Sequence, residues 1–292
     1  MAPRIISLLF ILNVCIAQAQ LPKVSGGTLS RYEAFQSTYI PSRTIDVWRS
    51  DNLPVTNVIY MHDGQMLFDS TITWNKQEWG VDETLLKLIQ AKKIKSTLVV
   101  AIWNTPARRQ EYFPQQPFNE IPNLLKDSIT KDIGGLPYSD QYLKFIVEEL
   151  KPFIDSTYRL KQQTNTVIAG ASMGGLISLY AICRYPQVFQ SAICMSTHWP
   201  GSVYRNTQTI PQIFSSYLQQ QLPAPNTHQF YFDLGTETLD AWYGYGQQLV
   251  DDVMKQNGYT SKNWMTKLFQ GDAHNENAWR NRLAIPFQFV LK

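Results

Sequence analysis

The hydrophobic and polar positions of this chain follow two alternating patterns over most of its length. Short runs of apolar and β-branched residues predict buried strands, and longer stretches with apolar residues at helical spacing predict amphipathic helices. Strands are expected at 55–61, 97–103, 166–169, 191–196, 229–234 and 264–269, and helices at 81–91, 140–158, 176–181, 210–221 and 247–257. This alternation favours one mostly parallel, doubly wound α/β sheet.

The first strands follow a different pattern. Residues 32–40 and 43–48, joined at Pro41-Ser42, read as an antiparallel hairpin. We therefore expect an N-terminal antiparallel hairpin at the beginning of the parallel sheet.

Residues 104–138 do not fit the alternation either. The stretch is long, rich in proline and poor in periodicity, and such connections in a compact domain are commonly functional or disordered. Its aromatic residues Tyr112, Phe113 and Phe118 favour a packed lid or a substrate wall. A surface excursion without a role is the alternative.

The N-terminus has the pattern of a secretory signal peptide. Arg4 precedes an apolar run at 5–16, and Ala17-Gln18-Ala19 fits a cleavage site for signal peptidase. The run is too short to span a bilayer as a helix. We expect residues 1–19 to be removed, leaving one catalytic domain at 20–292 in a secreted or periplasmic protein without membrane insertion.

Composition excludes several other classes. The formal net charge of +3 falls to +2 without Arg4, and no basic cluster indicates nucleic acid as a partner. No metal-binding spacing and no Gly-rich nucleotide loop occurs, so neither a metal nor another cofactor is expected. Cys183 and Cys194 lie in apolar runs and are predicted to be buried thiols, with one disulfide as the alternative.

The most informative segment surrounds Ser172. Gly170-Ala171-Ser172-Met173-Gly174 follows an apolar strand and precedes an apolar helix. Such a turn holds its serine in a strained conformation with Oγ above the sheet edge, which is the arrangement of a nucleophile. A serine that only caps the helix is the alternative. We expect Cβ atoms at Gly170 and Gly174 to collide with neighbouring backbone.

A serine hydroxyl needs a base, and the chain has four histidines. His274 comes directly after the last predicted strand, at the carboxyl edge where functional loops converge, and is the predicted base. His62 lies at the end of a strand and is expected to shape the site. His198, with Trp199, is expected to line the substrate pocket, and His228 is expected to be structural.

The acid is expected between the serine and the histidine in the chain. Asp233 lies inside a strand and is more consistent with a structural acceptor. Asp240 and Glu237 both lie in the following loop, where a carboxylate could orient the imidazole. Asp240 is preferred because Glu237 is very close to the strand end, but the sequence leaves both open.

Two backbone N–H groups must face the developing oxyanion. One belongs to Met173, the residue after the serine. For the other we choose Gln65, in the loop His62-Asp63-Gly64-Gln65, where Gly64 lets the backbone turn its amides towards the site.

Several motifs together resemble the putative-esterase family of α/β-hydrolases, which includes enterochelin, feruloyl and acetylxylan esterases and esterase D. They are Met-His-Asp-Gly-Gln-Met-Leu-Phe at 61–68, the Gly-Ala-Ser-Met-Gly-Gly turn, Gly-Thr-Glu at 235–237, and Ala-His-Asn-Glu with a following Trp at 273–279. The resemblance covers about residues 30–290. It implies an α/β-hydrolase fold and a Ser-His-acid mechanism.

Related proteins carry an Arg-x-Glu-Tyr element near the pocket, so the resemblance suggests that Arg109 contacts an anionic or hydroxyl-rich acyl group. A surface arginine paired with Glu111 is the alternative. The predicted function is a serine carboxylic-ester hydrolase that forms an acyl-enzyme, acting on an aromatic, sugar-linked or siderophore-type ester. Acyl transfer to a carbohydrate, or a binding protein with a degenerate site, are the competing hypotheses.

Overall fold

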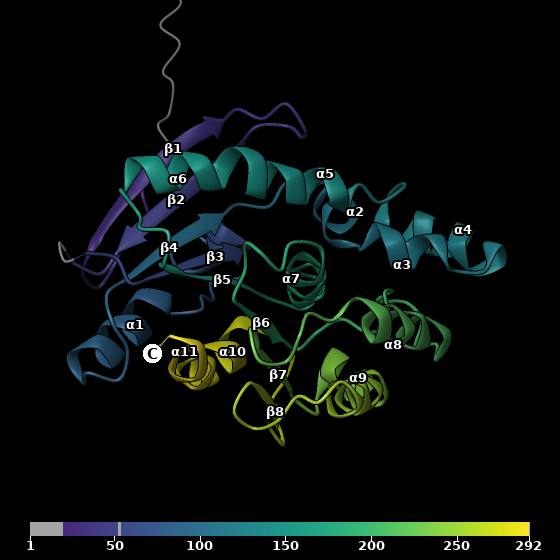
Figure 1. Ribbon diagram of the computed structural model, residues 1–292. Helices are drawn as coiled ribbons and strands as arrows, with labels where there is room; N and C mark the ends of the chain where they lie inside the picture. The colour runs from purple at the N-terminus through teal and green to yellow at the C-terminus, as the bar shows by residue number, and fades with distance from the viewer. Residues whose placement is uncertain (1–19, 52–53, 292) are drawn as a thin grey trace, which may run out of the picture.

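A computed structural model describes residues 20–51 and 54–291, so the signal peptide expected at 1–19 lies outside the described residues. An eight-stranded sheet with the order β1-β2-β4-β3-β5-β6-β7-β8 forms its centre (Figure 1). β1 pairs antiparallel with β2 and β2 antiparallel with β4, and every later pairing is parallel. The expected α/β-hydrolase architecture with an N-terminal antiparallel hairpin is therefore confirmed.

Most elements lie close to the predicted ranges, but the first strand, expected at 32–40, lies at Thr28–Phe35 instead. The strands are β1 (Thr28–Phe35), β2 (Arg43–Arg49), β3 (Asn57–His62), β4 (Thr97–Ile102), β5 (Asn165–Ala171), β6 (Ser191–Met195), β7 (Gln229–Leu234) and β8 (Trp264–Leu268). The α-helices are α1 (Val81–Gln90), α2 (Arg108–Tyr112), α3 (Gln115–Asn119), α4 (Asn123–Ile133), α5 (Ser139–Lys144), α6 (Lys151–Thr157), α7 (Met173–Arg184), α8 (Thr209–Gln221), α9 (Gly244–Gln256), α10 (Glu276–Arg282) and α11 (Ala284–Val290). Two short 3-10 helices are Gly64–Met66 and Thr238–Trp242, and a π-helical turn, Phe145–Leu150, joins α5 to α6.

The central strands are buried along their whole length because helices cover both faces of the sheet. Side chains along a strand alternate between the faces. In β3, Val58 and Tyr60 belong to one apolar core, while Ile59 and Met61 belong to the other. In Figure 1, α1, α10 and α11 lie on one side of the sheet and α5 to α9 on the other.

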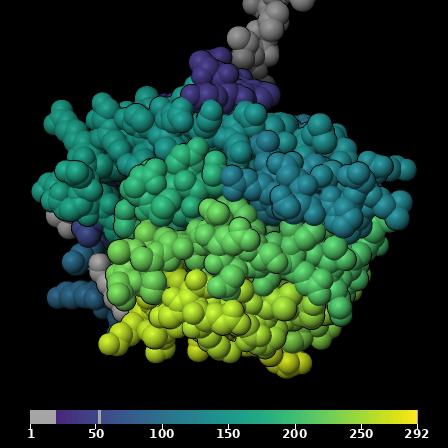
Figure 2. Space-filling view, turned by 45° about the vertical axis from the view of Figure 1, so that its right-hand side comes forward, coloured from purple at the N-terminus to yellow at the C-terminus, as the bar shows by residue number. Residues whose placement is uncertain are grey.

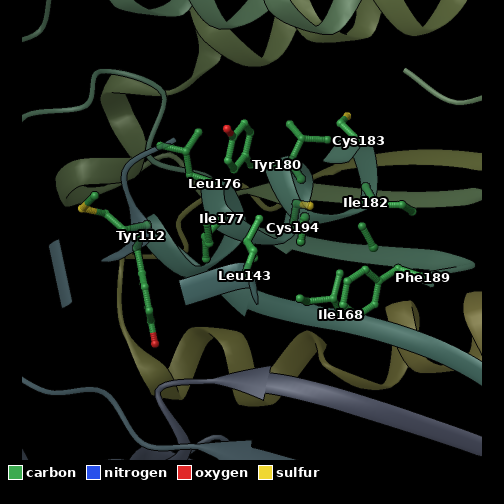
Figure 3. Close-up of a cluster of buried hydrophobic side chains, with 14 of the residues drawn as sticks. Tyr112, Leu143, Ile168, Leu176, Ile177, Tyr180, Ile182, Cys183, Phe189 and Cys194 are labelled. Carbon is green, nitrogen blue, oxygen red and sulfur yellow. The ribbon is translucent and has the colours of Figure 1, made fainter. Parts of the chain in front are cut away.

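Figure 3 shows part of the larger core, in which side chains of β5, β6 and α7 are joined by Tyr112 of α2, Leu143 of α5 and Phe189. Both cysteines of the described region, Cys183 and Cys194, are buried there and unpaired. The prediction of two buried thiols is thus confirmed, and the disulfide alternative is wrong.

Residues 104–138 contain more regular structure than their sequence indicated. Three short helices, α2, α3 and α4, occupy most of the segment. Pro114 directly precedes α3 and Pro122 directly precedes α4, so prolines mark where these two helices begin. Tyr112, Phe113 and Phe118 are buried in the larger core, so they anchor residues 104–138 to the rest of the protein. Figure 2 shows this segment (blue-green) packed against the green chain that follows β6.

No helix among residues 20–51 and 54–291 is long and apolar enough to cross a membrane. The carboxyl ends of the parallel strands β5, β7 and β8 lead into the segments that carry Ser172, Asp240 and His274. The sheet therefore places all three at one edge.

Candidate active site

Ser172 occupies the sharp turn between β5 and α7. Its φ of 59° and ψ of −123° are unfavourable for a residue with a Cβ, at a cost of about 1–3 kcal/mol. The Ser172 N–H donates to Met195 O at 3.0 Å, and the Ser172 carbonyl accepts from the N–H of His198 at 3.2 Å. Strand β6 and the loop that follows it thus hold Ser172 in its strained conformation.

The glycines around Ser172 differ in whether close packing requires a residue without a Cβ. A Cβ at Gly170 would lie 2.6 Å from the carbonyl carbon of Gly174, so the expected collision exists there. At Gly174 the nearest atoms would be 3.5 Å away, an ordinary contact, so the expected collision at that position is wrong. The tight position is instead Gly175, where a Cβ would lie 2.8 Å from Thr197 Oγ1.

His274 lies against Asp240, with its Nδ1 2.5 Å from Asp240 Oδ1. Asp240 is buried, and its Oδ2 accepts hydrogen bonds from the Gly235 N–H at 2.5 Å and from the Ser196 hydroxyl at 2.6 Å. Burial alone would raise the pKa of Asp240, but the hydrogen bonds from His274, Ser196 and Gly235 lower it below its usual value. Asp240 is therefore ionised at neutral pH. Glu237, the other acid left open by the sequence, is exposed.

The ring of His274 is fixed from several directions. Its backbone N–H donates to Thr238 Oγ1 at 2.8 Å. The rings of Tyr243 and Trp279 meet it edge-on, with centroid distances of 5.5 Å and 5.1 Å. With Nδ1 bound to Asp240, Nε2 is the nitrogen left for Ser172.

Ser172 and His274 line the same cavity. No hydrogen bond joins Ser172 Oγ to His274 Nε2 among the described residues. In enzymes without substrate this bond is often long and tightens only when substrate binds.

The loop after β3 departs from its expected conformation. The left-handed residue is Asp63, with φ 58° and ψ 42°, and not Gly64. A Cβ at Gly64 would lie 2.6 Å from the carbonyl carbon of Ala101, so glycine is required there by close packing on β4. The backbone N–H groups of Met173 and Gln65 find no acceptor within the described part of the chain. Both are available as donors.

Asp63 and Arg108 form a two-point ion pair in the cavity wall. Arg108 Nε and Nη2 donate to the two Asp63 oxygens at 2.6 Å and 2.7 Å, and Asn104 Nδ2 donates at 2.5 Å. Burial opposes ionisation of Asp63, but the Arg108 guanidinium outweighs it and lowers the pKa of Asp63. The negative charge of Asp63 thereby compensates the positive charge of Arg108.

Arg109 lines the cavity, as expected of a substrate contact, and its Nη1 donates to the Asp132 carbonyl at 3.0 Å. The alternative pairing with Glu111 is wrong. Glu111 is fully buried and binds Arg43, with one N–O distance of 2.6 Å. The sequence did not indicate this pair because the two residues lie 68 positions apart.

The cavity has a volume of about 660 Å³ and a wall rich in tryptophan and amide side chains. It is lined by Asp63, Met66, Trp74, Asn75, Gln77, Trp79, Asn104, Pro106, Arg108, Arg109, Ala171, Ser172, His274, Asn275, Glu276 and Trp279. Trp74 stands out because it is 83% exposed, an unfavourable position for a large apolar ring. Sequence reasoning missed Trp74, Trp79 and Trp279, since no local pattern connects 74–79 with 279. A second cavity of about 670 Å³, between α3 and α8, lacks all the predicted catalytic residues.

His198 and Trp199 do not line the cavity, and that expectation is corrected. Trp199 is 1% exposed, and its ring packs so closely on α9 that a Cβ at Gly246 would lie 2.4 Å from Trp199 Cβ. His198 is also buried, and its Nδ1 lies 2.7 Å from the Tyr243 hydroxyl. Both face the core because the loop after β6 turns beneath α9.

The two other histidines lie outside the cavity. His62 is buried, with Nδ1 2.8 Å from the Tyr142 hydroxyl, and burial lowers the pKa of His62 to about 3. His228 contacts the Thr227 hydroxyl and the Pro186 carbonyl. His62 supports the Ser172 region, since it lies 3.5 Å from a Cβ built on Gly174.

The strand order and the strained serine after a central parallel strand define an α/β-hydrolase. The chain belongs to the family described as putative esterases, whose model matches residues 46–284.

Other proteins are similar to this chain in sequence or in fold. The uncharacterised protein YbbA of Bacillus subtilis (strain 168) is 24% identical over 261 residues, covering 85% of this chain and 90% of YbbA. An IroE-like serine hydrolase from Shewanella oneidensis superimposes with a TM-score of 0.64 at 17% identity, over 91% of this chain and 79% of that one. The enterobactin esterase FES from Shigella flexneri gives 0.61 at 15% identity over 92% of this chain, which spans 60% of FES. The protein is an enzyme, a carboxylic ester hydrolase.

Proposed function

We propose that this hydrolase is a serine esterase with Ser172 as nucleophile, His274 as base and Asp240 as the acid. The observation that carries the proposal is the strained Ser172 in one cavity with His274, whose Nδ1 is bound by the ionised Asp240. A carboxylate in this position selects the tautomer of the imidazole and stabilises its cation.

In the proposed reaction, His274 Nε2 takes the proton from Ser172 as Oγ attacks the ester carbonyl. The N–H groups of Met173 and Gln65 stabilise the oxyanion of the tetrahedral intermediate. His274 then gives the proton to the leaving alcohol, which departs and leaves an acyl-enzyme. Water, deprotonated by His274, attacks the acyl group and releases the acid and free Ser172.

The cavity wall favours an ester with a planar aromatic acyl group that carries hydroxyls. Trp74 offers an exposed ring at the cavity, with Trp79 and Trp279 beside it, their centroids 5.2 Å apart. Arg109 supplies a cation for phenolate or carboxylate oxygens. Feruloyl esters and the catechol esters of siderophores have this chemistry, and FES was crystallised with enterobactin and with 2,3-dihydroxy-N-benzoyl-glycine.

We further propose that residues 20–292 act as one catalytic domain and that 104–138 form a wall of its cavity. Asn104, Pro106, Arg108 and Arg109 from this segment line the site. The A-x-A pattern at 17–19 supports export of the mature chain. Amino-terminal sequencing of protein recovered from the producing cells should give Gln20 as the first residue, and a retained Met1 would contradict export by cleavage.

The function is tested with a panel of vinyl acetate, methyl ferulate, acetylated xylan and a catechol tri-ester. The wild-type enzyme should hydrolyse methyl ferulate or the tri-ester best, and Ser172→Ala should lower turnover by about a million-fold or to background. Turnover by Ser172→Ala equal to wild type would contradict the mechanism. A product assay with added xylo-oligosaccharide distinguishes release of free acid from acyl transfer.

A further inference from the structure

The loop that carries the proposed oxyanion donor, Gln65, begins with a strained residue. Asp63 has φ 58° and ψ 42°, a left-handed conformation that few residues other than glycine adopt. The 3-10 helix Gly64–Met66 follows directly, and the Met66 N–H donates to the Asp63 carbonyl at 2.9 Å. The Gln65 N–H lies between these two residues. Its direction therefore depends on what holds Asp63 in this conformation.

Two side chains from the segment after β4 hold the Asp63 carboxylate. Arg108 binds both of its oxygens, and Asn104 Nδ2 donates to Oδ1 at 2.5 Å. Asp63 is buried, so little water competes for these bonds. Asp63 lines the same cavity as Ser172, and an uncompensated carboxylate there would repel an oxyanion. The positive charge of Arg108 offsets this repulsion, so the loop can hold an acid and still stabilise an anion.

Gln65 and Asn104 bind each other through two hydrogen bonds. Gln65 Nε2 donates to Asn104 Oδ1 at 2.7 Å, and the Asn104 backbone N–H donates to Gln65 Oε1 at 3.1 Å. A backbone N–H can only donate, so Gln65 turns its oxygen towards it and its NH2 group towards the Asn104 oxygen. Asn104 then turns its own NH2 group towards the Asp63 carboxylate, which can only accept. Each hydrogen bond of this chain therefore has one possible direction.

The Gln65 side chain is partly buried and is not among the described residues that line the cavity, so its two hydrogen bonds hold the loop and not the substrate. We propose that the side chains of Gln65 and Asn104 are positioning residues for the oxyanion hole. Their pairing, anchored on Asp63 and Arg108, fixes the direction of the Gln65 backbone N–H. This role rests on the serine mechanism proposed above. A donor fixed in advance stabilises the oxyanion without reorganisation, so loss of the pairing slows the chemical steps and leaves substrate binding nearly unchanged.

The test uses Gln65→Met, which keeps the backbone N–H and the length of the side chain and removes both bonds of the pair. The matched control is Gln190→Met, because Gln190 is also partly buried, accepts the Thr166 backbone N–H at Oε1 over 2.8 Å, and lies outside the cavity. The measurements are kcat and KM for vinyl acetate and the inhibition constant of 2,2,2-trifluoroacetophenone. The carbonyl carbon of this ketone bonds Ser172 Oγ, the serine proton passes to His274, and the carbonyl oxygen becomes an oxyanion. Gln65→Met should lower kcat and weaken inhibition by about 10–100-fold each, with KM within about twofold of wild type, and Gln190→Met should match wild type in all three.

Asn104→Ala gives a second test, since it removes the side-chain partner of Gln65. Both substitutions break one pairing, so the double variant should have a kcat within about twofold of the slower single variant. Losses that multiply in the double variant, wild-type kcat in Gln65→Met, or a lower kcat with unchanged inhibition by the ketone would each overturn the positioning role and leave the serine mechanism intact. Failure of a fluorophosphonate to label the wild-type enzyme at Ser172 would overturn both.

Discussion

The hydroxyl of Ser196 donates to Asp240 Oδ2 over 2.6 Å, although the two residues belong to different strand–loop units. Ser196 Oγ in turn accepts from Trp279 Nε1 at 3.0 Å and from Arg282 Nη2 at 2.7 Å. One serine oxygen therefore connects the proposed acid to helix α10, which also supplies part of the cavity wall.

Ser196→Ala should weaken both activity and stability. Asp240 loses one of its donors, and the buried N–H groups of Trp279 and Arg282 lose an acceptor, so the free energy of unfolding should fall by about 1–3 kcal/mol. We expect kcat to fall by roughly tenfold, since the orientation of His274 depends on Asp240. Urea unfolding and steady-state kinetics measure the two effects. Ser202→Ala, which removes a comparable bond to Asp132 outside the cavity, should leave kcat unchanged.

The choice between the two acids can be tested directly. Asp240→Asn should lower kcat by roughly 10³–10⁴-fold, because an amide cannot stabilise the imidazolium of His274. Glu237→Gln, three residues earlier and exposed, is the matched control and should retain wild-type kcat. A large loss in Glu237→Gln with a small loss in Asp240→Asn would reverse the assignment.

The fold could be predicted because its determinants are local. Strands buried on both faces are continuous apolar runs, and the helices between them carry apolar residues at regular spacing. Ser172 was expected from the turn directly after a strand, and Asp240 and His274 were expected from the loops that follow two later strands. The parallel sheet then brings those positions to one edge without further information from the sequence.

What the sequence could not show are contacts between segments far apart in the chain. The bond between Ser196 and Asp240 and the pair of Arg43 with Glu111 have no local signature. The prediction that Trp199 lines the substrate pocket was wrong for the same reason. Its place beside a histidine at a strand end suggests a pocket, but the close approach of α9 at Gly246 buries it.

Trp74 should determine selectivity for aromatic acyl groups. Stacking of rings contributes about 0.5–1.5 kcal/mol, so Trp74→Ala should raise KM for methyl ferulate by about 2–10-fold. The KM for vinyl acetate, which has no ring, should change little. Tyr204→Ala removes another exposed aromatic side chain that does not line the cavity, and it should have no effect on either substrate. Equal KM changes for both esters in Trp74→Ala would contradict the stacking role.

His62 should make the protein less stable in acid. Burial lowers the pKa of His62 from 6.5 to about 3 in the folded protein. Between pH 6.5 and about pH 3, His62 is therefore protonated in the unfolded chain but not in the folded protein. The free energy of unfolding therefore falls as pH drops below about 6.5, and it continues to fall until the folded pKa is reached. Between pH 7 and pH 5 this contribution amounts to about 2 kcal/mol.

His62→Asn removes this titration and leaves an amide beside the Tyr142 hydroxyl. The variant has a smaller side chain in the core, so its stability at neutral pH should be lower than that of wild type. The informative quantity is the difference between pH 7 and pH 5, which should be smaller by about 2 kcal/mol in the variant than in wild type. His198 titrates similarly in both proteins and cancels from the comparison. Urea unfolding at the two pH values measures it, and an unchanged difference would mean that His62 takes up a proton in the folded protein.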